Sequence, residues 1–591
     1  MRILGISDAS VCGGAALYED GAITWAIDEE RLNRQKLSTG FPALSIAEVL
    51  RLANLGPEDI DAVYAADRWN YYAPQSERWR GWLTHSPGPL KSTMYGVSSS
   101  LSPIVGPFGG PQVFYTLKKV LTRHRRTLVT RRLREEFGFR CPIDFVDHHH
   151  CHVMAAYLTA GKPNATALTL DGGGDNLCSR VYRIRDGGID SLSTTDSFHS
   201  IGNYYAYVTY LCGFTAHKHE GKITGLAPRG EPKYLDVLRR MIVHRDGRWR
   251  NIGGRYYWSA ARHLEQALPK GWKMEDLACS IQQHLEAEAS AFVDHWVRVS
   301  GEPDLIVAGG VFANVRLNQV CEELESVRSM FIHPAMGDEG LAFGAACAGA
   351  FELDRAAALR LARTPIEHVF LGPDITLAQT EEALRGAGLL EPPCPDIDER
   401  IAELLAEGYV IARCAGRMEY GPRALGNRSI LYRPDDPSVN DWLNERLRRT
   451  EFMPFAPITR VETVEDAYLN ASSVTHPARF MTITRHCTPK MRRTCGGVVH
   501  VDGTARPQYV DPAVTPGLHR ILRSFARRTG LTSLINTSFN IHEEPIVCTA
   551  KDAVRAFLDG HLDYLALGDR LIRNPQLERK PAELERVAQG D

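Results

Sequence analysis

Residues 145–176 read FVDHHHCHVMAAYLTAGKPNATALTLDGGGDN and constrain the fold more than any other segment. His148 and His152 are four residues apart, so on a helix both imidazoles would lie on one face and could bind one cation. Residues 165–170 are predicted to form a buried strand that ends in Asp171 and a glycine turn. This combination is typical of a metal-nucleotide site in an α/β fold. The alternative is a polar helix cap followed by an ordinary turn.

Two other glycine loops follow predicted strands. SDASVCGG at 7–14 lies in a meander with predicted strands at 1–7, 13–18 and 22–27, and VAGGVFAN at 307–314 follows an apolar strand at 305–308. Each loop alone could be a plain turn. Three strand-then-glycine loops separated by helices match the phosphate and adenosine loops of actin, sugar kinases and Hsp70. We therefore predict an α/β, duplicated N-terminal domain with a nucleotide in its cleft.

At 591 residues the chain is too long for one hydrophobic core. We predict a boundary near 365, which gives domains at 1–365 and 366–591. Residues 69–140 depart from the α/β pattern, because they are rich in aromatic residues and proline and then in arginine and lysine. They could form a lid or an insertion facing a substrate or a partner, or a basic helix in solvent. Apolar residues from Leu277 to Trp296 at spacings of four and seven predict a core helix.

Net charge and cysteine pattern give no reason to expect a nucleic-acid-binding, membrane-binding or disulfide-bonded protein. A formal net charge of −2 gives no reason to expect nucleic acid or an anionic membrane as the main partner. The thirteen cysteines include no C-x-x-C pair, which favours a reduced, cytoplasmic setting. The chain opens directly on a predicted strand and has no run of eighteen apolar residues, so we expect neither a signal peptide nor a membrane span.

Asp338 begins a predicted helix rich in alanine and glycine, and it could be a helix cap. It could also be a fourth ligand beside His148, His152 and Asp171. Two imidazoles and two carboxylates suit iron, manganese or zinc better than magnesium. We expect a divalent or trivalent metal at this site, with iron favoured.

The second domain has its own candidate site, for an anion. A predicted helix at 397–407 and a predicted strand at 409–414 precede AGRMEYGPRALGNRSILY, which holds Arg417, Arg423 and Arg428. Arginines beside glycines at a strand end suit phosphate or carboxylate, although they could also be surface charge. Farther on, another predicted strand ends in a polar cluster that could hold ribose or phosphate oxygens or form a turn: Asn536, Thr537, Ser538 and Asn540.

The order of these motifs resembles the NodU and CmcH type of O-carbamoyltransferases. The strings that carry the resemblance are DEERLNRQK (28–36), FVDHHHCH (145–152), DGGGD (171–175), EGKITGLA (220–227), VAGGVFAN (307–314), YGPRALGNRS (420–429), MPFAP (453–457), ARPQ (505–508) and INTSFNIHEEPIV (535–547). They cover most of the chain except about 69–140.

The resemblance implies two active sites. The N-terminal domain would be Kae1-like and the C-terminal domain YrdC-like. The C-terminal site would make carbamoyl adenylate from carbamoyl phosphate and ATP with Mg²⁺. At the N-terminal site a hydroxyl of a small natural product would attack the carbamoyl carbon and AMP would leave, as in antibiotic biosynthesis and other secondary metabolism. A homodimer could form.

The resemblance also implies roles for individual residues. The expected ligands of carbamoyl phosphate and ATP are Arg417, Arg423, Arg428, Ser429, Arg448, Arg506, Asn536, Thr537, Ser538 and Asn540. The expected contacts of the adenylate in the first domain are Gly172, Gly173, Lys222, Gly309, Gly310 and Asn314. The expected catalytic residues are Asp8, His149, Arg423 and Arg428.

Two departures from the family pattern affect these expectations. Relatives carry a histidine in the first glycine loop, but the first histidine here is His85. The general base is therefore open among Asp8, Cys12, His149, His217 and His219. Arg448 stands where lysine is usual, which keeps the charge but changes its geometry.

Two other functions compete with carbamoyl transfer. One is a tRNA-modifying enzyme of the threonylcarbamoyl type, and the other is a non-catalytic nucleotide-binding protein of the Hsp70-like fold. Pyrophosphate release that depends on carbamoyl phosphate would separate them.

Overall fold

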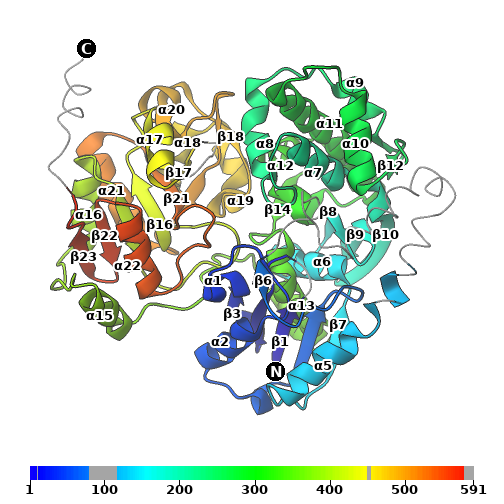
Figure 1. Cartoon of the computed structure of the whole chain (residues 1–591), viewed down its shortest axis with the longest axis horizontal. Helices are drawn as coiled ribbons and strands as arrows, with labels where there is room; N and C mark the ends of the chain where they lie inside the picture. The colour runs from blue at the N-terminus through cyan, green and yellow to red at the C-terminus, as the bar shows by residue number, and fades with distance from the viewer. Residues whose placement is uncertain (9–10, 79–115, 117, 121, 449–453, 578–591) are drawn as a thin grey trace.

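The computed structural model describes residues 1–8, 11–78, 116, 118–120, 122–448 and 454–577 (Figure 1). The chain begins with a five-stranded sheet in which β1, β2 and β3 form an antiparallel meander and β5 and β7 run parallel to β1. In spatial order its strands are β3 (Ala22–Asp28), β2 (Gly14–Glu19), β1 (Arg2–Ser7), β5 (Ala62–Ala66) and β7 (Ile143–Val146).

A second sheet repeats this topology. Its strands are β10 (Gly188–Asp196), β9 (Leu177–Arg185), β8 (Ala165–Gly174), β13 (Asp304–Ala308) and β14 (Ser329–Ile332). Here too the first three strands are antiparallel and the last two run parallel to the central one. The first domain is therefore an internal duplication, and its two sets of parallel strands each direct their carboxyl ends to one edge.

Two helices, α6 (His148–Thr159) and α13 (Leu341–Leu353), pack against each other and link the sheets: α13 lies on β1, β2 and β5, whereas α6 lies on β8 and β13. In the second half, α7 (Ile201–Leu211) and α11 (Met274–Ser300) pack on β8, and α8 (Glu220–Leu226) and α12 (Val315–Glu322) pack on α11. The other helices and strands of this domain are α1 (Glu29–Asn33), α2 (Ala43–Ala53), α5 (Arg125–Glu135), α9 (Leu235–Arg239), α10 (Tyr257–Ala267), α14 (Arg355–Leu361), β4 (Ser38–Thr39), β6 (Glu77–Arg78), β11 (Ile242–Arg245) and β12 (Arg248–Asn251).

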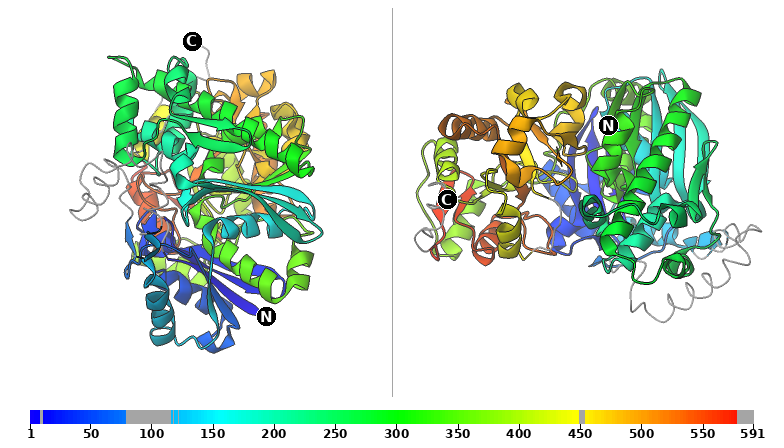
Figure 2. Two further views of the ribbon diagram at one scale, coloured as in Figure 1. Left: turned by 90° about the vertical axis from the view of Figure 1, so that its right-hand side faces the viewer. Right: turned by 90° about the horizontal axis from the view of Figure 1, so that it is seen from above.

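A mixed seven-stranded sheet forms the rest of the molecule and lies beside the duplicated domain (Figures 1 and 2). Its strands in spatial order are β20 (Gln508–Val510), β17 (Ala456–Arg460), β21 (Ser533–Ser538), β16 (Arg428–Tyr432), β15 (Ile411–Cys414), β22 (Tyr564–Leu567) and β23 (Arg570–Arg573). Helices α16 (Ile397–Ala406) and α21 (Pro516–Thr529) pack as one pair, and α15 (Leu377–Gly386) and α22 (Ala550–Asp559) as another. The remaining elements are α17 (Val439–Arg446), α18 (Val464–Ala467), α19 (Thr475–Arg479), α20 (Pro489–Thr494), β18 (Arg485–His486) and β19 (Thr504–Ala505).

The loop at 415–427 docks the second domain on the first. The Arg417 guanidinium donates to the Thr24 carbonyl over 2.6 Å and stacks 3.8 Å from the centre of the Trp25 ring. Arg31 donates to the Gly421 carbonyl over 2.9 Å, and the Tyr420 hydroxyl donates to the carbonyl of Glu339. Each of these side-chain donors binds a backbone carbonyl of the other domain, so the contact does not depend on the side chains of the accepting residues.

The structure confirms the predicted α/β class, the strands of the opening meander, the strands before Asp171 and Gly309, and the helix that carries His148 and His152. The helix predicted from Leu277 to Trp296 is α11. Part of the basic segment is helical as α5, whereas 79–115, within the predicted insertion, lies outside the described residues. The predicted boundary near 365 stays a prediction. None of the described helices is long and apolar enough to cross a membrane.

Candidate active sites

Four predicted metal ligands, His148, His152, Asp171 and Asp338, meet between the two halves of the first domain. One donor atom from each lies within 4.8 Å of the others. The Nε2 atoms of the two histidines are 3.2 Å apart, and Asp171 Oδ2 lies 3.2 Å from His152 Nε2. Asp338 Oδ1 is 3.7 Å from His148 Nε2. Two buried imidazoles and two partly buried carboxylates fit a transition metal or zinc.

Close backbone packing sets this geometry. A Cβ atom at Gly174 would overlap the His148 ring, so only glycine fits where β8 passes α6. A Cβ atom at Gly344 would overlap the Cys151 carbonyl, so α13 touches the backbone of α6. Asp338 begins a 3₁₀ turn (Asp338–Gly340) immediately before α13, and that contact therefore holds the histidines opposite this carboxylate.

The predicted glycines surround Asp171. The Gly172 amide donates to Asp171 Oδ1 over 2.6 Å and the Gly310 amide donates to Oδ2 over 3.3 Å. Gly309 has φ 104°, and a side chain there would strike the Leu170 backbone. A Cβ atom added at Gly173 would lie 2.7 Å from Ser197 Oγ. Both loops thus direct backbone groups towards one carboxylate.

Asp67, which we did not predict from the sequence, orients the first ligand. Its Oδ1 lies 2.7 Å from His148 Nδ1, so the Nδ1 hydrogen points to Asp67 and Nε2 faces the cluster. Burial alone would lower the pKa of His148, but the carboxylates of Asp67, Asp171 and Asp338 raise it well above the usual value. Burial raises the pKa of Asp171, yet both histidines together bring it well below its usual value. The signal for Asp67 was its position directly after the apolar strand 62–66.

The structure does not support a catalytic role for Asp8 or His149. Asp8 is fully buried in an ion pair with Arg125. His149 Nδ1 lies 2.8 Å from the Thr169 hydroxyl, and its Nε2 lies 2.9 Å from the Leu177 carbonyl, to which it donates. Burial, and then the neighbouring His148, lower the pKa of His149 to about 3. Both ring nitrogens of this neutral imidazole are thus used in structural contacts.

His217, another candidate base, lies beside the glycine turn that follows Asp171. A Cβ atom at Gly172 would lie 3.1 Å from His217 Cε1, so this imidazole borders the glycine turn. Burial lowers the pKa of His217 to about 4. The ring is therefore neutral near pH 7, which is the state that a base requires.

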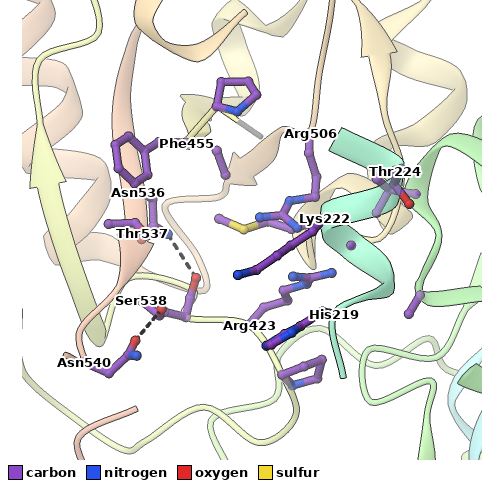
Figure 3. A pocket seen from close by; sticks show the side chains of 18 of the residues that line it. His219, Lys222, Thr224, Arg423, Phe455, Arg506, Asn536, Thr537, Ser538 and Asn540 are labelled. Carbon is purple, nitrogen blue, oxygen red and sulfur yellow. Dashed lines mark hydrogen bonds between the residues drawn. The ribbon is translucent and has the colours of Figure 1, made fainter. Parts of the chain in front are cut away.

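A cavity of about 300 Å³ lies between the two domains (Figure 3). Among the described residues, five that carry a lysine or arginine side chain line it, and they come from both domains: Lys36, Lys218, Lys222, Arg423 and Arg506. Figure 3 shows Lys222 reaching from α8 towards Arg423 and Arg506. The predicted polar cluster at 536–540 forms the opposite wall, where the Ser538 hydroxyl donates to Asn540 Oδ1 over 2.6 Å. This arrangement can hold a phosphate-rich anion.

Four of the predicted anion ligands lie elsewhere. Arg428 is buried and donates to the carbonyls of Ala415, Gly416, Asn427 and Pro373, so it is a structural residue. Arg417 forms the interdomain contact described above. The Ser429 hydroxyl accepts from the Gly426 amide over 2.9 Å. Arg448 is exposed and is not among the residues that line the cavity.

Asn314 also has a structural contact. Its side-chain oxygen accepts from the Leu317 amide and caps α12, while its Nδ2 donates to Gln282 over 2.8 Å. The lining residues Lys36, Lys218, Phe455 and Glu543 were missed. Lys218 lies in the turn before α8 and Lys222 lies within that helix, so helical spacing in the sequence does not mark this pair.

Comparison with known proteins agrees with a two-part chain. Residues 2–347 match the family model described as Carbamoyltransferase N-terminus, and residues 402–574 match Carbamoyltransferase C-terminus. Nodulation protein NolNO of Sinorhizobium fredii is 32% identical over 575 residues, which cover 95% of this chain and 78% of that protein. Nodulation protein U of Rhizobium tropici is 30% identical, over 96% of this chain and 95% of that protein.

A third relative carries an activity in its name. The 3'-hydroxymethylcephem-O-carbamoyltransferase of Amycolatopsis lactamdurans is 30% identical over 272 residues, which cover 46% of this chain and 48% of that protein. The two family models together span both domains that hold the metal cluster and the cationic cavity. This protein therefore belongs to the carbamoyltransferase family.

Proposed function

We propose that this enzyme is an ATP-dependent O-carbamoyltransferase that divides its reaction between the two sites. The observation that carries the proposal is the presence, in one carbamoyltransferase chain, of a cationic cavity and a separate cluster of two histidines and two aspartates. The first site suits anion activation and the second suits group transfer. The duplicated sheets support a Kae1-like first domain, and the mixed seven-stranded sheet supports a YrdC-like second domain.

Carbamoyl adenylate would form in the interdomain cavity, with release of phosphate from carbamoyl phosphate and of pyrophosphate from ATP. Carbamoyl phosphate and ATP together bring several negative charges, which repel one another until cations neutralise them. Arg423, Arg506 and Lys222 supply those cations from two domains, and Mg²⁺ would accompany ATP. Asn536, Thr537, Ser538 and Asn540 supply short polar groups for ribose or phosphate oxygens.

The transfer step would take place at the cluster. His148, His152, Asp171 and Asp338 would hold the metal, for which we favour iron, and when bound it would supply Lewis-acid chemistry. The amides of Gly172 and Gly310 donate to Asp171 and would hold this ligand in place, and the two glycine loops that carry them would border the adenylate. His217 would take the proton of the acceptor hydroxyl, since it is a neutral imidazole beside this turn.

The acceptor would be a small natural product with a free hydroxyl. The named activity of the cephem relative supports a hydroxymethyl-type acceptor. We expect the enzyme to act in the cytoplasm.

Two measurements test the proposal. Pyrophosphate should be released from ATP only when carbamoyl phosphate is present, and labelled carbamoyl should then appear on one of a panel of hydroxylated metabolites. ATP that stays intact under these conditions, with metal-loaded protein, would refute the proposed activation step.

A further inference from the structure

Glu543 is the one carboxylate among the described residues that line the interdomain cavity. Its side chain reaches Lys218 of the first domain and forms a close ion pair with it. His219 Nε2 lies 3.5 Å from Glu543 Oε1. The pair is largely buried, since the side chains of Lys218 and Glu543 are 9% and 29% exposed.

The local electrostatics favour an ionised Glu543. Burial alone would raise its pKa, but Lys218, Lys36 and His219 lower it to about 2. The protein therefore places its own anion where the cavity holds cations from two domains. Any ligand that uses Lys218 has to replace this carboxylate.

The backbone at Glu543 gives an independent observation. Its φ is 63°, in the left-handed region that favours glycine. A residue with a side chain is strained in this conformation. Strain of this kind, held at a ligand cavity, is a reason to look for a function of the side chain.

We propose that Glu543 determines which anions the cavity accepts. A small anion such as inorganic phosphate carries only one or two negative charges, so it would replace the charge of Glu543 at Lys218 and gain little. A polyphosphate brings several charges, so it displaces Glu543 and still gains attraction from Lys36, Lys218 and Lys222. The inference rests on the proposed function, because it takes the cavity to be the site of ATP and carbamoyl phosphate.

Glu543→Gln tests this selectivity. We expect the variant to bind inorganic phosphate roughly tenfold more tightly, as the loss of a competing ion pair would allow, and tripolyphosphate less than about threefold more tightly. The preference for tripolyphosphate over phosphate should shrink accordingly. Calorimetric titration at one fixed ionic strength measures both affinities, first without Mg²⁺ and then with it.

Glu543→Gly provides a second variant that also removes the backbone strain, and it should bind phosphate as tightly as Glu543→Gln. The matched control is Glu544→Gln. The neighbouring Glu544 pairs with Arg555, and neither lines the cavity, so phosphate binding should not change. The gain in phosphate affinity should depend on Lys218. In a Lys218→Met background, the additional substitution Glu543→Gln should therefore leave phosphate affinity unchanged.

Three results would overturn the inference. The first is unchanged phosphate affinity in both Glu543 variants, and the second is a gain that persists in the Lys218→Met background. The third is a loss of tripolyphosphate binding seen only with Mg²⁺, which would make Glu543 a metal ligand. If neither the wild type nor any variant bound tripolyphosphate, the proposed function would fail as well.

Discussion

The metal cluster and the cationic cavity are built in opposite ways. The cluster lies inside one domain, and its ligands sit on short side chains fixed by backbone contacts at Gly174 and Gly344. The cavity lies between two domains, and its charges sit at the ends of long lysine and arginine side chains. A site of the first kind depends on geometry, whereas one of the second kind depends on charge and on how the domains dock.

The largest effect should follow removal of a cluster ligand. We expect His152→Ala to abolish carbamoyl transfer and weaken metal binding by more than about 100-fold, while pyrophosphate release continues. Metal content and both half-reactions can be measured on the same protein. His150→Ala is the control, because this histidine of α6 is not a member of the cluster. Loss of pyrophosphate release in His152→Ala would contradict a division between the sites.

Arg423→Ala should produce the reverse pattern. Without this guanidinium the charge of the reacting phosphates is less well neutralised, so carbamoyl-phosphate-dependent pyrophosphate release should fall about 100- to 1000-fold. Metal content should stay the same. Arg433→Ala, which removes an arginine paired with Asp435 outside the cavity, serves as control. Adenylate formation at the wild-type rate would show that the anion site lies elsewhere.

A smaller effect is expected from Asp67, which orients the metal ligand His148 before the metal binds. Asp67→Asn keeps a hydrogen-bond acceptor beside His148 but removes the charge, so metal affinity should fall about 10- to 100-fold. A competition titration with a chelator measures it. Asp61→Asn, before the same strand and exposed, should have no effect. If the Asp67 variant and the wild type bound the metal with equal affinity, the Asp67 carboxylate would not be needed to orient His148.

The smallest effect concerns the cavity and pH. Burial, then Lys222 and Lys218, lower the pKa of His219 to about 4, so the ring is neutral at pH 7. A bound anion would raise this pKa, so binding takes up a proton and should tighten as pH falls from 7 to 5. Sulfate is a suitable probe because it does not titrate there, and we expect a gain of about three- to tenfold.

His219→Gln should remove this pH dependence and leave sulfate affinity at pH 7 nearly unchanged. A sulfate affinity with the same pH dependence in the variant would assign the proton to another group.

The cluster was predictable from the sequence because its signals are local. A spacing of four residues on a helix and a carboxylate at a strand end define positions that the backbone then fixes. Asp338 lies beside the other three residues, as predicted, although nearly 170 residues separate it from Asp171. Asp67 was missed because only the pairing of β5 with β7 brings it to His148.

The cavity was less predictable because it depends on domain docking. Arg423 and Arg428 lie in one glycine-rich loop, and their spacing does not reveal that Arg423 reaches the cavity while Arg428 turns to backbone carbonyls. Lys36 and Lys218 become part of this site only when the first domain meets the second. Composition could indicate an anion site, but it could not select the arginines that form it.

The glycine at 344 has a consequence for the choice of ion. Because α13 touches the backbone of α6 there, the separation between the imidazoles and Asp338 is set by two main chains, which cannot stretch as side chains do. Such a rigid frame selects by ionic radius: an ion too large for the gap would have to push two helices apart. Gly344→Ala would place a methyl group against the Cys151 carbonyl and move the two helices apart. We would expect this variant to prefer larger metal ions before the separation became too great for any ion to bind.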